Sequence, residues 1–533
     1  MNGSHLSGAF RIRNLDVRRP LFWCPALKLA VHVATLAGYG VFRDELYYLA
    51  CADRLDVGYV DHPPLSIWIL RLVREVFGEA LWPMRAVAAL AGASAVLLVG
   101  LTARRLGAGT WGQATSMLLF MAVPIFWFSG HVYSMNAFEP LIWALVGLLW
   151  LGHPEREESD ARSPHWLVLG VVLGLGLLNK ASILWLGAGL GVALLVGSLR
   201  PQLKTLGPWI CGCLAMLIWA PFLIWQAAHG GPMLEFMHNA TGAKMQSVSA
   251  AGFVLRQIEM LGPIAAVFLG MGLVILAMSG GRRRDLGWIY ATVFLILLLS
   301  GSSRSGYLAP AYTWPAAAFG AWVDGRLGSR KGLKKTLQHG SILGLILFQG
   351  LVLAPLALPI LSVDTYVRYA EALGVTPGTE ERKAVGRLPQ HFADMFGWKE
   401  KTAAARRAFE GLNVEDRAKV CLAAQNYGVA GALEREDLLV PPAAGEVPRE
   451  PLPAVLSGHN SYWFWRPSSC TGEILIVLGD DAETLSKMFG SVEQVDTVRC
   501  EPCMPYEDEQ PVWLAREPRI TFDEVWPAIK SFN

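Results

Sequence analysis

The sequence predicts a polytopic α-helical membrane protein with about eleven transmembrane helices, followed by a soluble C-terminal α/β domain. The 533 residues are 53% hydrophobic, which is more apolar than is usual for a soluble chain whose surface must be wetted. Charged residues are also unevenly distributed, because long segments before residue 361 carry almost none. We therefore expect a membrane domain at 1–361 and an extracytoplasmic soluble domain at 362–533.

Eleven apolar runs approach the roughly 17–25 residues that a helix needs to cross a bilayer. They fall at 22–42, 82–103, 110–129, 137–152, 165–179, 181–199, 206–226, 262–279, 286–301, 307–323 and 338–361. The fifth run is short, so with the sixth it is a candidate for a broken or re-entrant pair around Asn179 and Lys180. The first run ends at Arg43 without a small-residue cleavage site, which indicates a retained helix rather than a cleaved signal.

Basic residues in the short loops give the orientation, because such residues accumulate on the cytoplasmic side. With eleven spans, five basic clusters fall on one side. They are Arg11, Arg13, Arg18 and Arg19; Arg104 and Arg105; Arg200 and Lys204; Arg282, Arg283 and Arg284; and Arg330, Lys331, Lys334 and Lys335. The first outer loop, 43–81, and everything after about 362 then lie outside. Within that loop, 65–77 has the charge spacing of a helix in the membrane interface, with a plain loop helix as the alternative.

The soluble part contains a charged helical stretch at 399–411 and a glycine-bounded strand at 472–479, which together predict a mixed α/β domain. Four of the eight cysteines also fall there: Cys421, Cys470, Cys500 and Cys503. Disulfides are permitted if this part is extracytoplasmic, but the sequence does not give their pairing. A metal half-site at Cys500 and Cys503 is the alternative, although a second pair is missing.

The first candidate catalytic and binding residues lie in the first outer loop. Asp44 and Glu45 lie at the outer end of the first span, beside Tyr47 and Tyr48. A carboxylate there can act as a general base. The alternative is that these charges only solvate the end of the helix. A turn stiffened by two prolines follows, and it carries Tyr59, Asp61 and His62. When protonated, His62 can donate to a phosphate oxygen, although a lone histidine is more often structural.

Further polar groups occur at the outer ends of later runs. Asn136 and Glu139 start the run at 137–152, and a charge inside a membrane helix costs about 2.5–3.5 kcal/mol at the bilayer centre. Glu139 therefore faces a cavity or neutralises a nearby cation. Lys180 and Arg304 are suited to a lipid phosphate, with snorkelling at a helix end as the alternative.

Acid–base groups and cations at one membrane boundary suit a lipid-phosphate leaving group and a nucleophile that must lose a proton. The absence of a P-loop, a Rossmann glycine pattern and an HExxH motif leaves soluble nucleotide chemistry unsupported. The net charge of +2 gives no electrostatic case for nucleic acid.

Several motifs resemble the family 39 glycosyltransferases, relatives of the protein O-mannosyltransferases and of the lipid A aminoarabinose transferase. The motifs at 43–50 and 58–65 resemble the first outer loop of that family, and further motifs follow in order at 133–141, 176–180 and 307–312. Segments at 388–394, 457–463 and 503–507 resemble the C-terminal domain of a bacterial branch. Two positions depart from the family pattern: His62 stands where the aminoarabinose transferases have lysine, and Glu139 where relatives usually have aspartate.

The resemblance implies a GT-C fold and an inverting transfer of sugar from a polyprenyl-phosphate donor to an acceptor hydroxyl, at the outer face of a bacterial plasma membrane. Asp44 would be the catalytic base, supported by Glu45. Tyr48 and Tyr59 would line the donor site, and Lys180 and Arg304 would hold the donor phosphate. The full predicted substrate-binding set is Tyr47, Tyr48, Tyr59, Asp61, His62, Asn136, Glu139, Lys180, Arg304 and Tyr307.

The reaction is expected to need no cofactor, and no metal site is predicted. The outer carboxylates could nevertheless bind a divalent metal ion. The alternatives are a flippase for lipid-linked saccharides and a non-catalytic glycolipid-binding protein. A flippase is expected to place charges deep along a path through the helices. The sequence names neither the sugar nor the acceptor, which is a protein, a lipid or a polysaccharide.

Overall fold

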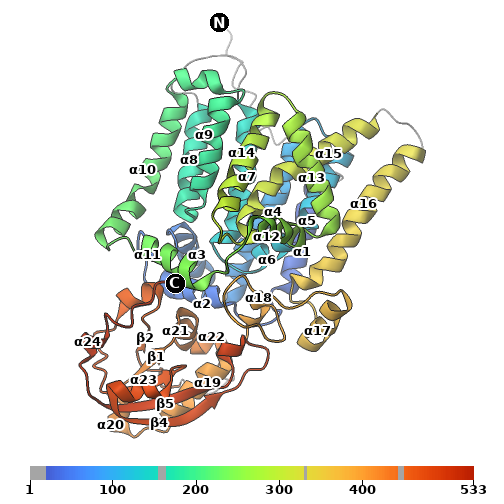
Figure 1. Ribbon diagram of the computed structural model, residues 1–533. Helices are drawn as coiled ribbons and strands as arrows, with labels where there is room; N and C mark the ends of the chain where they lie inside the picture. The colour runs from blue at the N-terminus through green and yellow to red at the C-terminus, as the bar shows by residue number, and fades with distance from the viewer. Residues whose placement is uncertain (1–19, 154–163, 329–332, 442–448) are drawn as a thin grey trace.

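The computed structural model describes residues 20–153, 164–328, 333–441 and 449–533. A bundle of helices forms one body, and the C-terminal part (residues 362–533) packs against one end of it (Figure 1). The bundle consists of α1 Pro20–Thr35, α2 Arg43–Asp53, α3 Leu65–Phe77, α4 Leu81–Arg105, α5 Thr110–Met121, α6 Pro124–His131, α7 Met135–Gly152, α8 Pro164–Asn179, α9 Ile183–Val196, α10 Gly207–Ala228, α11 Pro232–Asn239, α12 Ala250–Leu261, α13 Pro263–Met278, α14 Arg282–Leu299, α15 Thr313–Gly328 and α16 Leu333–Leu353.

Each predicted apolar run contains a helix, but the helices differ in length and several are bent. Within the described residues, four helices are long and apolar enough to cross a membrane. They are α4 (Leu81–Arg105), α7 (Met135–Gly152), α10 (Gly207–Ala228) and the stretch Thr336–Leu356, which consists of most of α16 and the short helical turn after it. Two further pairs qualify only as broken spans, α5 with α6 at a bend of 71° and α12 with α13 at 113°. The structure thus gives four to six candidate spans by length and composition, and the count of eleven stays a prediction.

The first outer loop is mostly helical, because α2 and α3 fill it. The predicted helix at 65–77 is confirmed as α3. Its two faces differ: Ile67 and Leu70 are fully buried, whereas Leu72 and Val76 are exposed. This amphipathic character fits a helix at the membrane boundary, and its place in the interface stays a prediction. Both helices lie at the end of the bundle that meets the C-terminal part (Figure 1).

The basic loops that were predicted to be cytoplasmic meet at one end of the bundle. Arg105, Arg282 and Arg283 line a cavity of about 560 Å³ together with Ser198 and Gln202. This grouping agrees with the predicted placement of three of the five clusters on one side. Arg11, Arg13, Arg18, Arg19, Arg330 and Lys331 lie outside the described residues, as do the side chains of Lys334 and Lys335.

The C-terminal part is built on a five-stranded mixed sheet with strand order β2-β1-β3-β5-β4. The strands are β1 Val420–Ala424, β2 Val455–Leu456, β3 Ile474–Leu478, β4 Phe489–Val498 and β5 Gln510–Pro518. Strand β1 is parallel to β2 and β3, and β5 is antiparallel to β3 and β4. The helices are α17 Val363–Ala372, α18 Gln390–Ala393, α19 Trp398–Glu410, α20 Val414–Arg417, α21 Tyr427–Leu433, α22 Glu436–Leu439, α23 Ala482–Met488 and α24 Phe522–Val525.

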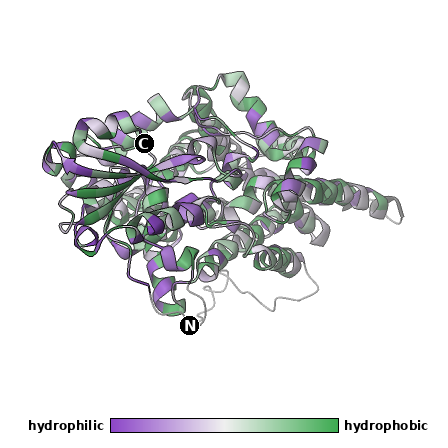
Figure 2. Ribbon diagram, turned by 90° about the horizontal axis from the view of Figure 1, so that it is seen from below, coloured by the Kyte–Doolittle hydropathy of each residue, from purple (hydrophilic) through white to green (hydrophobic). Residues whose placement is uncertain are grey.

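Helices cover both faces of this sheet, which confirms the predicted α/β character. Alternate residues of β3 point to opposite faces: Ile476 packs with α19 and α21, and Val477 packs with α23. All five residues of β3 are buried, as is typical of a central strand. The predicted helix at 399–411 and the predicted strand at 472–479 correspond to α19 and β3. Seen from the side of the C-terminal part, hydrophilic and hydrophobic segments alternate in it, whereas hydrophobic segments dominate the bundle (Figure 2).

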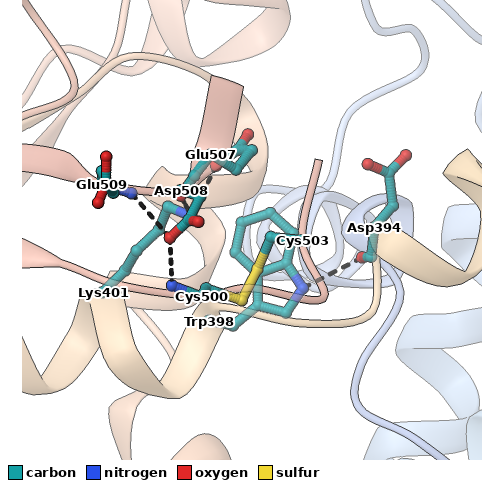
Figure 3. Close-up of a disulfide and its surroundings, with 8 residues drawn as sticks. All are labelled: Asp394, Trp398, Lys401, Cys500, Cys503, Glu507, Asp508 and Glu509. Atoms are coloured by element: carbon teal, nitrogen blue, oxygen red, sulfur yellow. Dashed lines mark hydrogen bonds and ion pairs between the residues drawn. A yellow bond between two sulfur atoms is a disulfide. The ribbon is translucent and has the colours of Figure 1, made fainter. Parts of the chain in front are cut away.

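The cysteine pairing that the sequence left open is Cys421 with Cys470 and Cys500 with Cys503. The second disulfide packs at the start of α19, beside Trp398 (Figure 3). Gly397 makes this close packing possible, because it has a φ of +87° and a Cβ there would lie 2.5 Å from the sulfur of Cys503. The Cys500-x-x-Cys503 pair is therefore a disulfide in this structure rather than half of a metal site.

Candidate active site

The first turn of α2 places three successive charged side chains, Arg43, Asp44 and Glu45, at the junction of the bundle and the C-terminal part. Phe42 is the extended residue before the helix, and its backbone N–H donates to Glu45 Oε2 over 2.9 Å. Carboxylates in a first turn interact favourably with the helix dipole, which favours a helix start at this point. Glu45 then contacts the bundle, whereas Asp44 and Arg43 contact different segments of the C-terminal part.

Glu45 pairs with Arg85 at the start of α4, and both side chains are fully buried. Arg85 donates to both carboxylate oxygens, at 3.0 and 2.8 Å, and the backbone N–H of Tyr133 donates to Oε1 at 3.0 Å. Arg85 also donates to the carbonyls of Leu36 and Gly40 at 2.8 Å. Since its oxygens are fully engaged, Glu45 fixes the position of α2 and has no oxygen free for proton transfer. Its supporting role at the site stays a prediction.

Asp44 is half-buried and reaches the C-terminal part. The hydroxyl of Tyr427 donates to Asp44 Oδ1 over 2.8 Å. Among the described residues, Oδ2 of Asp44 has no hydrogen bond or ion pair. One oxygen of the predicted base is therefore held, and the other is available to a substrate.

Arg43 makes the third connection. Its guanidinium lies 3.3 Å from Asp394 Oδ2 and donates to the hydroxyl of Tyr506 over 2.9 Å. Asp394 and Tyr506 belong to the C-terminal segments at 388–394 and 503–507 that the sequence had singled out. Trp398 donates to the Asp394 carbonyl over 3.2 Å, and the buried Lys401–Glu507 ion pair lies beside the Cys500–Cys503 disulfide (Figure 3).

Tyr47 links the first outer loop to the C-terminal part in a second place. Its hydroxyl lies 2.9 Å from Asp61 Oδ1 and 2.7 Å from the hydroxyl of Ser461. Burial raises the pKa of Asp61, with His62 and the Tyr47 hydrogen bond acting in the opposite direction. Ser461 belongs to the segment at 457–463, which the sequence had singled out without assigning it a partner.

His62 and Tyr59 lie inside an aromatic cluster. His62 is fully buried, with its ring 4.8 Å from that of Tyr48 and 5.0 Å from that of Tyr59. Tyr48 accepts a hydrogen bond from the backbone of Met135, and the hydroxyl of Tyr59 contacts the carbonyls of Cys51 and Arg54. In this structure neither His62 nor Tyr59 is open to a ligand, so a donor contact there requires the cluster to rearrange.

Lys180 lies between α8, which ends at Asn179, and α9, which begins at Ile183. Both are short apolar helices, and a broken or re-entrant pair at this point stays a prediction. The amine of Lys180 donates to Glu139 over 2.7 Å and to the Asn136 side chain over 2.8 Å. It also lies 5.3 Å from the centre of the Tyr307 ring. Glu139 thus neutralises a neighbouring lysine, which was one of its two expected roles.

Arg304 is held by a carboxylate that the sequence did not single out. Its guanidinium donates to Glu381 over 2.8 Å, and Lys244 lies 3.9 Å from the same carboxylate. Burial alone raises the pKa of Glu381, but Lys244, Arg43 and Arg304 together lower it below its ordinary value. Lys244 is also within electrostatic reach of Asp44. Asp44, Lys244 and Arg304 therefore occupy one region, and Tyr307 connects that region to Lys180.

The buried Asp394 predicts a pH-dependent stability. Burial raises the pKa of Asp394 to about 7, with Arg43 opposing, whereas an unfolded aspartate has a pKa of about 3.9. Between these values the folded state binds more protons than the unfolded state, so the stability contributed by this group falls as pH rises through 7. We expect the unfolding temperature of the wild type to drop more between pH 5 and pH 8 than that of Asp394→Asn, measured by tryptophan fluorescence in detergent. The exposed Asp364 offers the control Asp364→Asn, and equal slopes for all three proteins would contradict the prediction.

Residues 61–225 match the family model described as dolichyl-phosphate-mannose-protein mannosyltransferase. The chain is 24% identical over 287 residues to the lipid A galacturonosyltransferase RgtD of Rhizobium johnstonii, covering 52% of this chain and 58% of RgtD. It is 26% identical over 328 residues to the undecaprenyl phosphate-alpha-4-amino-4-deoxy-L-arabinose arabinosyl transferase 2 of Pseudomonas fluorescens, covering 57% and 58%. The match thus spans little more than half the length of these relatives.

A solved structure of ArnT from Cupriavidus metallidurans bound to undecaprenyl phosphate resembles this chain with a TM-score of 0.59 at 15% identity, covering 92% of this chain and 97% of ArnT. At this identity the likeness establishes the fold. It agrees with the order of the motifs and with the family match over 61–225. The predicted resemblance to the family 39 glycosyltransferases is confirmed, and the chain has the fold of its solved GT-C neighbour.

Proposed function

We propose that the chain is an inverting glycosyltransferase that moves a sugar from a polyprenyl-phosphate donor to an acceptor hydroxyl at the extracytoplasmic face of the bacterial plasma membrane. The observation that carries this proposal is the state of Asp44: Tyr427 holds one carboxylate oxygen, the other is unengaged, and cations lie in the same region. The similarity to the galacturonosyltransferase RgtD and to the arabinosyl transferase supports a sugar-transfer reaction. The similarity to the second, an undecaprenyl phosphate-alpha-4-amino-4-deoxy-L-arabinose arabinosyl transferase, also supports an undecaprenyl-phosphate donor.

In the proposed reaction, Asp44 takes the proton of the acceptor hydroxyl, and the acceptor oxygen attacks the anomeric carbon of the donor sugar. The bond between that carbon and the phosphate oxygen breaks, and polyprenyl phosphate leaves with the electron pair. A single displacement inverts the anomeric centre. Among the described residues, three cations are available to the phosphate: Lys180, Lys244 and Arg304. Lys244 has the longest ion pair of the three, because its amine lies 3.9 Å from its carboxylate partner.

Two observations support an extracytoplasmic site. The C-terminal part contains two disulfides, which persist in oxidising compartments. The basic loops around Arg105 and Arg282 meet at one end of the bundle, whereas α2 and the C-terminal part lie at the other (Figure 1). The proposed base would therefore face the periplasm, where a prenyl chain can stay in lipid while its sugar reaches α2.

The test is a transfer assay with the full chain in liposomes containing undecaprenyl phosphate carrying a radiolabelled sugar. Acceptors are envelope lipids, polysaccharides and proteins isolated from cells that lack the protein, and mass spectrometry identifies the product. We expect the label to move to one acceptor class with stoichiometric release of undecaprenyl phosphate. Movement of labelled donor between leaflets without transfer would instead support a flippase, and binding alone would support a non-catalytic protein.

The same assay tests whether a divalent metal ion contributes to sugar transfer. Within the described ranges, no group of three His, Cys, Asp or Glu side chains is arranged to hold a metal ion. The proposed displacement uses only side chains of this chain, so no cofactor enters it. A parallel reaction in EDTA, with calcium, magnesium or manganese restored in separate tubes, shows whether a divalent ion contributes to transfer.

A further inference from the structure

The C-terminal part contacts the first turn of α2 through the short helix α21. Two glycines allow α21 to approach closely. A Cβ on Gly431 would lie 2.9 Å from the backbone of Leu46, and a Cβ on Gly428 would lie 2.6 Å from the Arg43 side chain. Since the surface of α21 toward α2 is largely backbone, the first side chain of α21, Tyr427, reaches Asp44.

Tyr427 is fixed on several sides. Its ring lies 4.7 Å from that of Tyr47 and 4.8 Å from that of His459. Asn426, the residue before it, caps α21 by accepting hydrogen bonds from the backbone of Gly428 and Val429. The Tyr427 side chain is 6% exposed. Its hydroxyl cannot leave Asp44 unless this packing opens.

A second hydroxyl from the C-terminal part reaches another carboxylate of the first outer loop, Asp61, through Tyr47. The Ser461 hydroxyl accepts from the backbone of Val60 over 3.1 Å and contacts the hydroxyl of Tyr47, which in turn contacts Asp61. The C-terminal part therefore contacts Asp44 directly and Asp61 through the hydroxyl of Tyr47.

We propose that Tyr427 is a positioning residue for Asp44, so that the C-terminal part completes the transferase site. The inference rests on the proposed function and on Asp44 as its base. By donating to Oδ1, Tyr427 fixes the rotation of the carboxylate and leaves Oδ2 for the acceptor proton. A hydrogen bond to the ionised carboxylate also favours the form that acts as a base.

The surroundings allow Tyr427 to keep this role at neutral pH. Burial raises the pKa of the Tyr427 phenol well above its ordinary value, so it remains protonated and able to donate. The other charges that face Asp44 are Arg43, Lys244, Asp61 and Asp394. All four are retained when only the Tyr427 hydroxyl is removed.

The test is Tyr427→Phe, which removes the hydroxyl and retains the ring. We expect kcat for transfer to fall roughly 10- to 100-fold, as for loss of a hydrogen bond to a charged group, with the donor KM within about twofold of wild type. The acid limb of the pH–rate profile should move to higher pH. Tyr462→Phe is the matched control: Tyr462 is also buried in the C-terminal part and donates to the Glu434 carboxylate over 2.8 Å.

Unfolding temperatures provide a readout that does not depend on activity. In a double-mutant cycle of Tyr427→Phe and Asp44→Asn, we expect non-additive shifts, because each change weakens the same hydrogen bond. Additive shifts would overturn the contact. Rates and pH profiles of Tyr427→Phe equal to those of Tyr462→Phe, with Asp44→Asn inactive, would overturn the positioning role but leave the function standing. An inactive wild type would instead overturn the proposed function.

Discussion

Replacement of Asp44 by asparagine is expected to lower sugar transfer by about 10²- to 10⁴-fold while donor binding stays near wild type, because the amide cannot take a proton from the acceptor. Asparagine has nearly the same shape as aspartate, and its side-chain oxygen can still accept from the Tyr427 hydroxyl, now 2.8 Å from Asp44 Oδ1. The fold should therefore be retained. Initial rates in the liposome assay and binding of the labelled donor measure the two quantities separately.

Asp56→Asn is the matched control for this prediction. Asp56 lies in the same outer loop, is exposed, and accepts from the Trp225 indole over 2.8 Å, away from Asp44. We expect it to transfer sugar at close to the wild-type rate. An Asp44→Asn protein that keeps more than about a tenth of wild-type activity would reject Asp44 as the general base.

The second large effect concerns stability. Arg85→Met is expected to cost about 3–5 kcal/mol of unfolding free energy, because it leaves the Glu45 carboxylate buried without its counter-ion. Both side chains of this pair are fully inaccessible to solvent. Loss of the pair should also free the start of α2 and lower transfer indirectly. Unfolding by denaturing detergent, followed by tryptophan fluorescence, measures the loss.

Two further variants decide whether the unpaired charge is the cause. Adding Glu45→Gln to Arg85→Met removes that charge and should recover part of the lost stability. Arg71→Met breaks the exposed ion pair with Glu75, at 2.7 Å, and should cost less than about 1 kcal/mol. A double variant that is less stable than Arg85→Met would contradict the explanation.

The helices were predictable from the sequence because long apolar runs and amphipathic spacing are local signals. The helix at 65–77 and the strand around 472–479 show this most clearly. The bends were not predicted, although their signals were present: Pro124 begins α6 directly after the first bend, and Gly262 separates α12 from α13, which begins at Pro263. Proline removes a backbone donor, and glycine tolerates the positive φ at that break, so both disrupt a continuous span.

The site was predictable as a set of residues but not as a set of contacts. Asp44, Lys180 and Arg304 were named because charge at a membrane boundary is unusual. The partners of Asp44 and Arg304, which are Tyr427 and Glu381, come from far along the chain, and only the tertiary fold brings them there. Arg85 was not predicted as part of the site, because an arginine near the end of an apolar helix is common. The motifs around Asp394, Ser461 and Tyr506 were recognisable, but no local pattern connected them to α2.

The three consecutive residues that begin α2 contact different segments of the protein, one in the bundle and the others in the C-terminal part. Glu45 binds α4 in the bundle, Asp44 meets α21, and Arg43 binds the segments that carry Asp394 and Tyr506. A hybrid enzyme that joins this bundle to the C-terminal half of another relative would therefore need compatible side chains at positions 394, 427 and 506. Without them, two of the three anchors of this helical turn would be lost at the splice.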